Sequence, residues 1–214
     1  MPAEADPALV EIWARAWALT RDVAPPCPVP GGWHIEVGLP DQARRYVYPS
    51  PGAVVAERAR SIDTPFTFLK VATSADAVRP LLPAGWEIGP PGFMMTATPT
   101  TSLPFDESRG YRLWLEPIAE HVTLATITTR NGELAASGRI GLVGDVGSFD
   151  RIRTQEAHQR RGLGSALMAA LGSAANAAGA KRWVLVATPQ GRALYEKLGW
   201  AVHVPYTTAF IPAP

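Results

Sequence analysis

The sequence predicts a mixed α/β fold in which helices flank a central, mostly antiparallel sheet. Residues 162–178 carry apolar side chains at helical spacing, and Gly179 follows where a left-handed C-terminal residue is favoured. Asn131-Gly132, the dipeptide most typical of a tight hairpin turn, joins two extended runs. From residue 111 onward we expect four strands, a helix, a strand, a helix and closing strands, an order typical of helices packed on one sheet.

Prolines interrupt the first half of the chain. Residues 7–20 are predicted as a helix because Leu9, Trp13 and Trp17 recur at helical spacing. The run APPCPVPGG at residues 24–32 is expected to stop regular structure and to act as a stiff connector. The other expected elements are strands at 33–37 and 66–71, helices at 53–60 and 74–82, and short extended pieces near Trp86 and at 93–98.

The second half has a clearer periodicity. Residues 99–110 combine turn formers and acids without a period and are expected to form a mobile loop. A second helix of this half is predicted at 190–198. Strands are predicted at 111–115, 120–130, 133–142, 146–154 and 182–187, with two closing strands at 200–204 and 207–211.

Composition limits the possible functions. The 214 residues are 47% hydrophobic and 18% charged, which suits one large domain or two small ones. A formal net charge of +1 offers no basic surface for nucleic acid. The single Cys27 excludes a disulfide framework, and the four histidines lack a metal-ligand spacing, so no metal is expected.

The sequence carries no pattern for membrane targeting. No apolar run reaches the length needed to span a bilayer, and the first residues lack the pattern of a signal peptide. We therefore expect a cytoplasmic protein with no membrane partner. The oligomeric state stays open between monomer and homodimer.

The segment most informative about chemistry runs from Asp150 to Ser165. A predicted strand ends near Thr154, and Gly162 and Gly164 then open the predicted helix. Amides at a helix N-terminus are unpaired and attract phosphate, and glycine lets the backbone approach an anion closely. The segment lacks the third glycine of a dinucleotide fingerprint and the Gly-Lys-Ser/Thr of a P-loop.

Two motifs occur in order around this helix. The first is Gln159-Arg-Arg-Gly162-Leu-Gly164, and the second is Leu194-Tyr195-Glu196-Lys197-Leu198-Gly199-Trp200. Together they resemble the signature of the GNAT superfamily of N-acetyltransferases over residues 111–211. The resemblance implies a GNAT fold, acetyl-CoA as co-substrate, and direct attack of a primary amine on the thioester. The acceptor would be a small molecule or a peptide.

The resemblance also implies roles for individual residues. Backbone groups of Ile152, Arg153 and Thr154 would hydrogen-bond the pantetheine arm, and the amide near Ile152 would polarise the thioester carbonyl. Tyr195 would protonate the departing thiolate as a general acid, unless it is a packing residue. The pyrophosphate would lie against the amides of Gln159, Arg160, Arg161, Gly162, Leu163, Gly164 and Ser165. The two arginines would add charge there, or are simply solvated.

Several positions depart from the family pattern. Glu156-Ala157-His158 stands where Pro-Glu is common. Thr188 stands where an asparagine assists cofactor placement, and Gly191 replaces a usual alanine. Thr188 can still hydrogen-bond and stays a cofactor-binding candidate. The departures leave open an alternative function, that of a non-catalytic acyl-CoA-binding sensor or scaffold.

The general base is the least defined part of the predicted site. Asp150 is the candidate because strand alternation would place it on the same face as Ile152 and Thr154. The alternatives are Glu116, Glu120 and His121, at the entry to the second strand of this half. Each of these side chains is equally well explained as a surface group.

The resemblance covers about half of the chain, so two domains are expected. Residues 99–214 would form the catalytic domain and residues 1–98 an N-terminal region. The run 68–73 with Gly85-Trp86 parallels 183–188 with Gly199-Trp200, and Pro40–Arg45 lies opposite Glu156–Arg161. Residues 33–98 are therefore hypothesised to be a degenerate second half of the same fold, with Tyr46 and Tyr48 at the glycine positions. Chance similarity of two β-α-β segments is the alternative.

Overall fold

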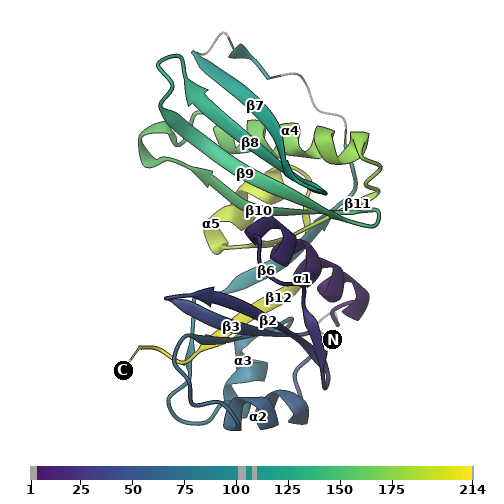
Figure 1. Cartoon of the computed structure of the whole chain (residues 1–214), viewed down its shortest axis with the longest axis vertical. Coiled ribbons are helices and arrows are strands. Elements are labelled where there is room, and N and C mark those ends of the chain that lie inside the picture. The colour runs from purple at the N-terminus through teal and green to yellow at the C-terminus, as the bar shows by residue number, and fades with distance from the viewer. Residues whose placement is uncertain (1–3, 101–104, 108–109, 214) are drawn as a thin grey trace. The chain divides into compact units, whose positions relative to one another are not determined.

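The computed structural model describes residues 4–100, 105–107 and 110–213, and the chain divides into two compact units (Figure 1). Unit 1 consists of Met1–Met95, Val186–Ala193 and Ala201–Pro214, and unit 2 of Thr96–Leu185 and Leu194–Trp200. Both units are thus built from discontinuous segments. A split into domains at residues 98 and 99 stays a prediction.

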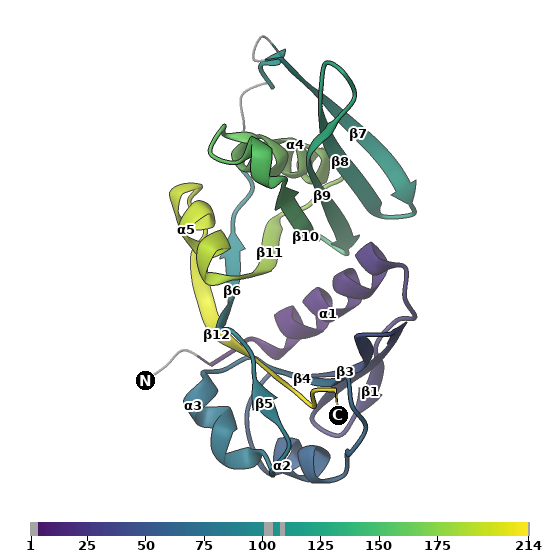
Figure 2. The same ribbon diagram turned by 90° about the vertical axis from the view of Figure 1, so that its left-hand side faces the viewer.

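Unit 1 is a sheet with helices on both faces. The strand order is β1-β2-β3-β4-β12, with β5 paired to β12. Strands β3 and β4 run parallel, and the pairs β1–β2, β2–β3, β4–β12 and β5–β12 are antiparallel. Figure 2 shows α1 on one face and α2 and α3 on the other. The strands are β1 (Cys27–Val29), β2 (Gly32–Leu39), β3 (Gln42–Tyr48), β4 (Thr67–Val71), β5 (Glu87–Ile88), β12 (Ala201–Phe210) and β6 (Gly92–Ala97), whose last two residues belong to unit 2. The helices are α1 (Pro7–Arg21), α2 (Ala53–Arg60), α3 (Ala75–Val78) and the 3-10 turn η1 (Arg79–Leu81).

Helix α1 confirms the helix predicted at residues 7–20. The Asp6 carboxylate accepts a hydrogen bond from the Ala8 amide at 3.0 Å and caps the helix start, where Pro7 fits the first turn. The apolar side of the helix buries Trp13 and Trp17, and the Trp13 ring meets that of Tyr206 edge-on at 5.1 Å between centroids.

Two predictions for unit 1 are wrong because pairing outweighs local pattern. The expected connector at 24–32 contains β1, which pairs with β2, because an edge strand tolerates proline where no partner needs its N–H. The two closing strands are one strand, β12, in which Pro205 precedes the Thr207–Phe210 segment that pairs with β4.

Strand β3 was not predicted, and it changes the alignment of the two halves of the chain. Tyr46 and Tyr48 lie on this strand and are buried in the unit 1 core, so their placement opposite the glycines of a loop is wrong. The order in which hairpin, helix and parallel strand follow one another along the chain is nevertheless similar in the two units. An antiparallel hairpin (β2–β3 or β9–β10) leads through one helix (α2 or α4) to a parallel strand (β4 or β11). The degenerate second half stays a hypothesis.

Unit 2 has the strand order β7-β8-β9-β10-β11, antiparallel except for the parallel pair β10 and β11. Helix α4 lies along one face of β8, β9 and β10, as Figure 1 shows. The predicted mixed fold with a mostly antiparallel sheet is therefore confirmed. The elements are β7 (Tyr111–Ala119), β8 (Val122–Thr129), β9 (Leu134–Val143), β10 (Val146–Thr154), η3 (Glu156–His158) and α4 (Leu163–Ala177), together with most of β11 (Arg182–Ala187) and the second part of α5 (Pro189–Lys197). The residues from Val186 to Ala193 in β11 and α5 belong to unit 1.

The turns of unit 2 follow the sequence closely. Gly132 has a φ of 86° in the β8–β9 turn, and its amide donates to the Thr129 carbonyl at 3.0 Å, so the predicted hairpin is confirmed. Gly179 has a φ of 90° just beyond α4, also as predicted. Half of the loop expected at 99–110, residues 101–104 and 108–109, lies outside the described residues.

The core of unit 2 lies between α4 and the sheet. Leu163, Leu167 and Leu171 form the buried face of the helix. Gly172 lies so close to the Trp183 ring that a Cβ would stand 2.7 Å from it, so glycine is required for this close packing. None of the helices in the described parts of the chain combines the length and the apolar character needed to cross a membrane.

Candidate active site

Strand β10 separates from β11 partway along its length. Their parallel pairing joins Val146 to Arg182 and ends, among the described residues, at Ser148 and Val184. Strand β10 continues to Thr154, paired with β9 on its other side. Beyond Ser148, β10 is therefore paired with β9 alone among the described strands, as at the edge of a sheet.

A β-bulge lies within this separated segment. The register with β9 shifts between Asp150 and Arg153, and Arg151 has a φ of 54°. Asp150 lies opposite Arg139 of β9, and Thr154 lies opposite Ala136. Because side chains alternate between the two faces along a strand, Arg139 and Ala136 point to opposite faces of the sheet. The bulge therefore places Asp150 on the opposite face from Thr154, and the alternation argument that grouped them is wrong.

Ile152 and Thr154 lie on the α4 face. The Ile152 side chain covers Gly138, beside Leu171 of α4. The Thr154 hydroxyl lies 3.8 Å from where a Cβ on Gly164 would stand. Of the residues expected to hold pantetheine, Thr154 thus borders the start of α4, Ile152 lies beside the middle of the helix, and Arg153 points the other way.

The start of α4 is suited to an anion. Gly162 is its N-cap residue, with φ 81° and ψ 1°, and it has no side chain to cap the helix. The first amide bonded back into the helix is that of Ala166, which donates to the Gly162 carbonyl at 3.0 Å. The amides of Leu163, Gly164 and Ser165 precede it in the first turn, where the helix dipole favours negative charge.

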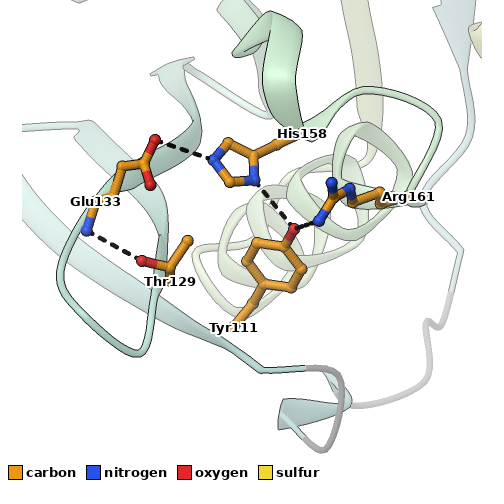
Figure 3. Close-up of polar contacts among 5 residues, drawn as sticks. All are labelled: Tyr111, Thr129, Glu133, His158 and Arg161. Carbon is orange, nitrogen blue, oxygen red and sulfur yellow. Dashed lines mark hydrogen bonds and ion pairs between the residues drawn. The ribbon is translucent and has the colours of Figure 1, made fainter.

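The loop between β10 and α4, residues 155–162, is held by its own side chains. The Gln159 amide group donates to the Thr154 carbonyl at 3.5 Å, at the limit of a hydrogen bond. Arg160 is exposed and has a left-handed φ of 59°. Arg161 donates from Nη1 to the Tyr111 hydroxyl at 2.9 Å, as Figure 3 shows, so this guanidinium is held by β7.

Tyr195 is buried on α5, at 8% exposure, with its ring 6.0 Å from that of Trp200. Burial, and next the nearby negative charge of Asp150, raise the pKa of Tyr195 to about 12. The hydroxyl therefore stays protonated throughout the physiological range and can donate a hydrogen bond to a developing anion.

The remaining candidates lie elsewhere on their elements. The Thr188 hydroxyl accepts a hydrogen bond from the Gly191 amide at 3.1 Å and so caps the start of α5. Glu116 is exposed on β7, and Glu120 and His121 form an exposed pair at 3.5 Å in the β7–β8 turn. Across the described residues, no group of three or more His, Cys, Asp or Glu side chains is arranged to hold a metal ion.

Sequence reasoning did not identify the contacts of His158. Its ring is buried between Tyr111 and Glu133, which are 47 and 25 residues away in the chain. A histidine just before a glycine-rich turn is the one local signal, and it does not indicate either partner.

The separated strand and the uncapped helix both lie in a segment that matches a known family. Residues 119–202 match the family model of the acetyltransferase (GNAT) domain. The chain carries a GNAT acetyltransferase domain. It is therefore an acyltransferase, and its fold is suited to acetyl transfer from acyl-CoA. No curated protein sequence matches the chain significantly.

Solved structures share the fold over nearly the whole chain. A GCN5-related N-acetyltransferase from Kribbella flavida aligns with a TM-score of 0.66 at 14% identity, covering 96% of each chain. An acetyltransferase of the GNAT family from Novosphingobium aromaticivorans aligns with a TM-score of 0.60 at 14% identity, covering 97% of this chain and 100% of its own. At such identities the similarity shows the fold, which includes the residues outside the GNAT domain match.

Proposed function

We propose that the chain transfers an acetyl group from acetyl-CoA to the nitrogen of a primary amine. The observation that carries the proposal is the separation of β10 from β11 beside the uncapped start of α4. The backbone of β10 at Ile152 to Thr154 lies beyond the pairing with β11 and is placed to meet an amide-containing arm, and the start of α4 offers amides for phosphate. Pantetheine and pyrophosphate are joined in this order in coenzyme A, so a single ligand uses both.

The binding roles follow from these two elements. The backbone of Ile152, Arg153 and Thr154 hydrogen-bonds the pantetheine arm, and the amides from Gln159 to Ser165 hold the pyrophosphate. Backbone amides supply most of this binding, which is how a chain with a net charge of +1 holds a strongly anionic ligand. Thr188, whose hydroxyl caps the start of α5, stays a predicted cofactor contact.

The reaction is a direct displacement at the thioester. The neutral amine nitrogen attacks the carbonyl carbon, the carbon–sulfur bond breaks to release coenzyme A as the thiolate, and the extra proton on the attacking nitrogen leaves to a base or to water, which gives the neutral amide. The Tyr195 hydroxyl donates to the departing sulfur. With a pKa of about 12 it is a weaker acid than an ordinary thiol at about 8.5, so it acts chiefly by a hydrogen bond that stabilises the developing thiolate.

Asp150 is the proposed base. It is partly exposed, and the bulge turns it to the face opposite α4, so the acceptor would approach it from that side. The acceptor is a primary amine on a small molecule or a peptide.

A thiol-release assay with a panel of amines tests the proposal. Free amino acids, polyamines, aminoglycosides and peptide N-termini are offered with acetyl-CoA, and at least one class is expected to release coenzyme A. Gly162→Glu places a carboxylate at the proposed pyrophosphate position and abolishes release. Gly179→Glu makes the same change at the other end of α4, also at a left-handed position, and retains it.

Two results would refute the proposal. If the chain binds acetyl-CoA but no amine class releases thiol, the sensor or scaffold function is correct instead. If Gly162→Glu binds acetyl-CoA as tightly as the wild-type chain in calorimetry, the start of α4 is not the phosphate site.

A further inference from the structure

Strand β7 is the last strand of the unit 2 sheet and is paired along one side only (Figure 1). That side pairs with β8, and no other strand among the described residues borders β7. Most of its side chains are exposed, including Trp114 at 57% and Leu115 at 46%. An exposed strand edge with large apolar side chains is a template for pairing with a further strand.

The register shows which backbone groups of β7 face away from β8. The Thr129 amide, at the end of β8, donates to the Glu133 carbonyl on the β9 side. Just before β8, the His121 carbonyl accepts from the Leu142 amide of β9. Odd-numbered positions thus face β9, and because neighbouring residues of a strand direct their backbone groups to opposite sides, even-numbered positions face β7. Trp114 lies opposite an even-numbered residue of β8, so its own backbone groups face β8.

Leu113 and Leu115 therefore direct their N–H and C=O groups to the open side of β7. Pro117, two residues further on, has the same orientation, which proline tolerates at an edge because no partner there needs its N–H. The open edge thus carries two complete pairs of donor and acceptor, one on each side of Trp114.

The five residues Arg112-Leu113-Trp114-Leu115-Glu116 are symmetric about the tryptophan. If a second copy pairs antiparallel about a two-fold axis at Trp114, each Leu113 lies opposite a Leu115 and each Arg112 opposite a Glu116. The two leucine pairs exchange four backbone hydrogen bonds. The two tryptophans meet on the axis as a pair without mutual hydrogen bonds, the kind in which side chains approach most closely.

The two charges favour this arrangement over others. Among the described residues, neither Arg112 nor Glu116 forms an ion pair within its own chain. Parallel pairing in register would place like charges opposite each other, and a shift of the antiparallel register by two residues would separate Arg112 from Glu116. Charges that protect a strand edge repel an incoming copy, whereas these two attract one.

The leucines extend an apolar face that the fold already has. Leu115 lies opposite Ala125 of β8, and Ala125 lies opposite Gly138 of β9. Gly138 lies against Leu171 of α4, so this row of side chains is on the α4 face of the sheet. Leu113 is on the same face, because it is two residues from Leu115. Pairing of two copies brings four leucines together there and the two tryptophans together on the opposite face.

We propose that β7 is a self-association surface, to which a second copy of this chain adds its own β7, antiparallel and centred on Trp114. A two-fold contact of this kind closes on itself, so the product is a dimer and not a fibre. One strand from each copy makes a small interface, so the dimer is expected to be reversible and to depend on concentration. The inference is independent of the proposed function, because association requires no acyl-CoA.

Sedimentation velocity over a range of concentrations tests the association. The wild-type chain is expected to show a monomer–dimer equilibrium. Glu116→Arg turns both attractive pairs into repulsive ones and is expected to raise the dimer Kd about tenfold or more. Arg112→Glu is expected to have the same effect with the opposite charge. Both side chains are exposed, so both variants are expected to fold.

A mixture of the two variants tests the register. In a dimer of one Glu116→Arg chain and one Arg112→Glu chain, every charge lies opposite a charge of the other sign. The mixture is therefore expected to associate about as tightly as the wild-type chain, although neither variant does so alone. A chain that carries both substitutions is expected to regain the wild-type Kd as well.

An apolar substitution and an exchange measurement complete the test. Trp114→Lys places two like charges on the axis and is expected to be monomeric, whereas Leu39→Lys, at a side chain 44% exposed on β2, is expected to keep the dimer. In hydrogen exchange, the amides of Leu113 and Leu115 are expected to become protected as the concentration rises. The Trp114 amide, which faces β8, is expected to be protected at every concentration.

A wild-type chain that stays monomeric up to millimolar concentration overturns the inference. A dimer that survives both Glu116→Arg and Trp114→Lys also overturns it, because the second copy would then bind elsewhere. Failure of the mixed variants to associate overturns the antiparallel register about Trp114. Each of these results leaves the proposed acetyl transfer untouched.

Discussion

Replacing Gly162 by alanine is expected to weaken acetyl-CoA binding about 5- to 30-fold. Gly162 has a φ of 81°, a left-handed conformation that costs an L-residue with a Cβ about 1–2 kcal/mol. In the variant the free loop relaxes to relieve this strain, and the ligand must restore the strained form before it binds. The apparent Kd then rises by the population ratio, which is a factor of about 5 to 30 for 1–2 kcal/mol.

Gly179 supplies a matched control at the other end of α4. It has a φ of 90°, and a Cβ there would meet no atom within 4 Å, so Gly179→Ala introduces similar strain without a clash. Urea unfolding is expected to show a comparable loss of stability in both variants, of about 1–2 kcal/mol. Calorimetry is expected to show weaker acetyl-CoA binding in Gly162→Ala alone. Equal Kd values in the two variants would refute the assignment of the α4 start to the pyrophosphate.

Three other predictions concern the acid, a buried amine and the number of sites. Tyr195→Phe is expected to lower kcat about 100-fold with little change in the acetyl-CoA Kd, and an unchanged kcat would exclude Tyr195 as the donor. Because burial raises the pKa of Tyr195 to about 12, the wild-type rate should show no loss from Tyr195 ionisation below about pH 11. Burial, and next the charges of Arg45 and Arg21, lower the pKa of Lys70 well below 10.5 in the folded chain. The unfolded chain therefore binds this proton more strongly than the folded chain, and the free energy of unfolding rises as the pH rises toward 10.5. Lys70→Met is expected to raise the Tm at pH 7 by an amount that shrinks as the pH approaches 10.5, and a Tm gain independent of pH would contradict this. Calorimetry is expected to give one acetyl-CoA per chain, whereas two would show that unit 1 retains a working site.

Elements that depend on local signals could be predicted from the sequence. Helix α4 begins within one residue of its predicted start, because its apolar spacing and its flanking glycines act over neighbouring residues. The β8–β9 turn likewise depends on the dipeptide Asn131-Gly132 alone. The start of α4 also carries the first family motif, so the phosphate-binding half of the site could be predicted from the sequence.

Elements that depend on distant contacts could not be predicted. Strand β3 contains Arg44 and Arg45, which break the apolar alternation of a half-buried strand. Arg45 is nevertheless buried, with its guanidinium 3.6 Å from the centroid of the Trp17 ring of α1, and no local pattern reveals that partner. The bulge at Arg151 depends in the same way on the register with β9, and it decides which face Asp150 occupies.

An NMR titration of the 15N-labelled chain with acetyl-CoA tests the central claim most directly. The amides of Leu163, Gly164 and Ser165 are expected to show the largest shifts, together with those of Ile152 to Thr154 on the separated part of β10. The amides at the far end of α4, around Gly179, are expected to stay in place. Saturable shifts confined to other parts of the chain, with the α4 start unmoved, would show that acyl-CoA does not bind between these two elements.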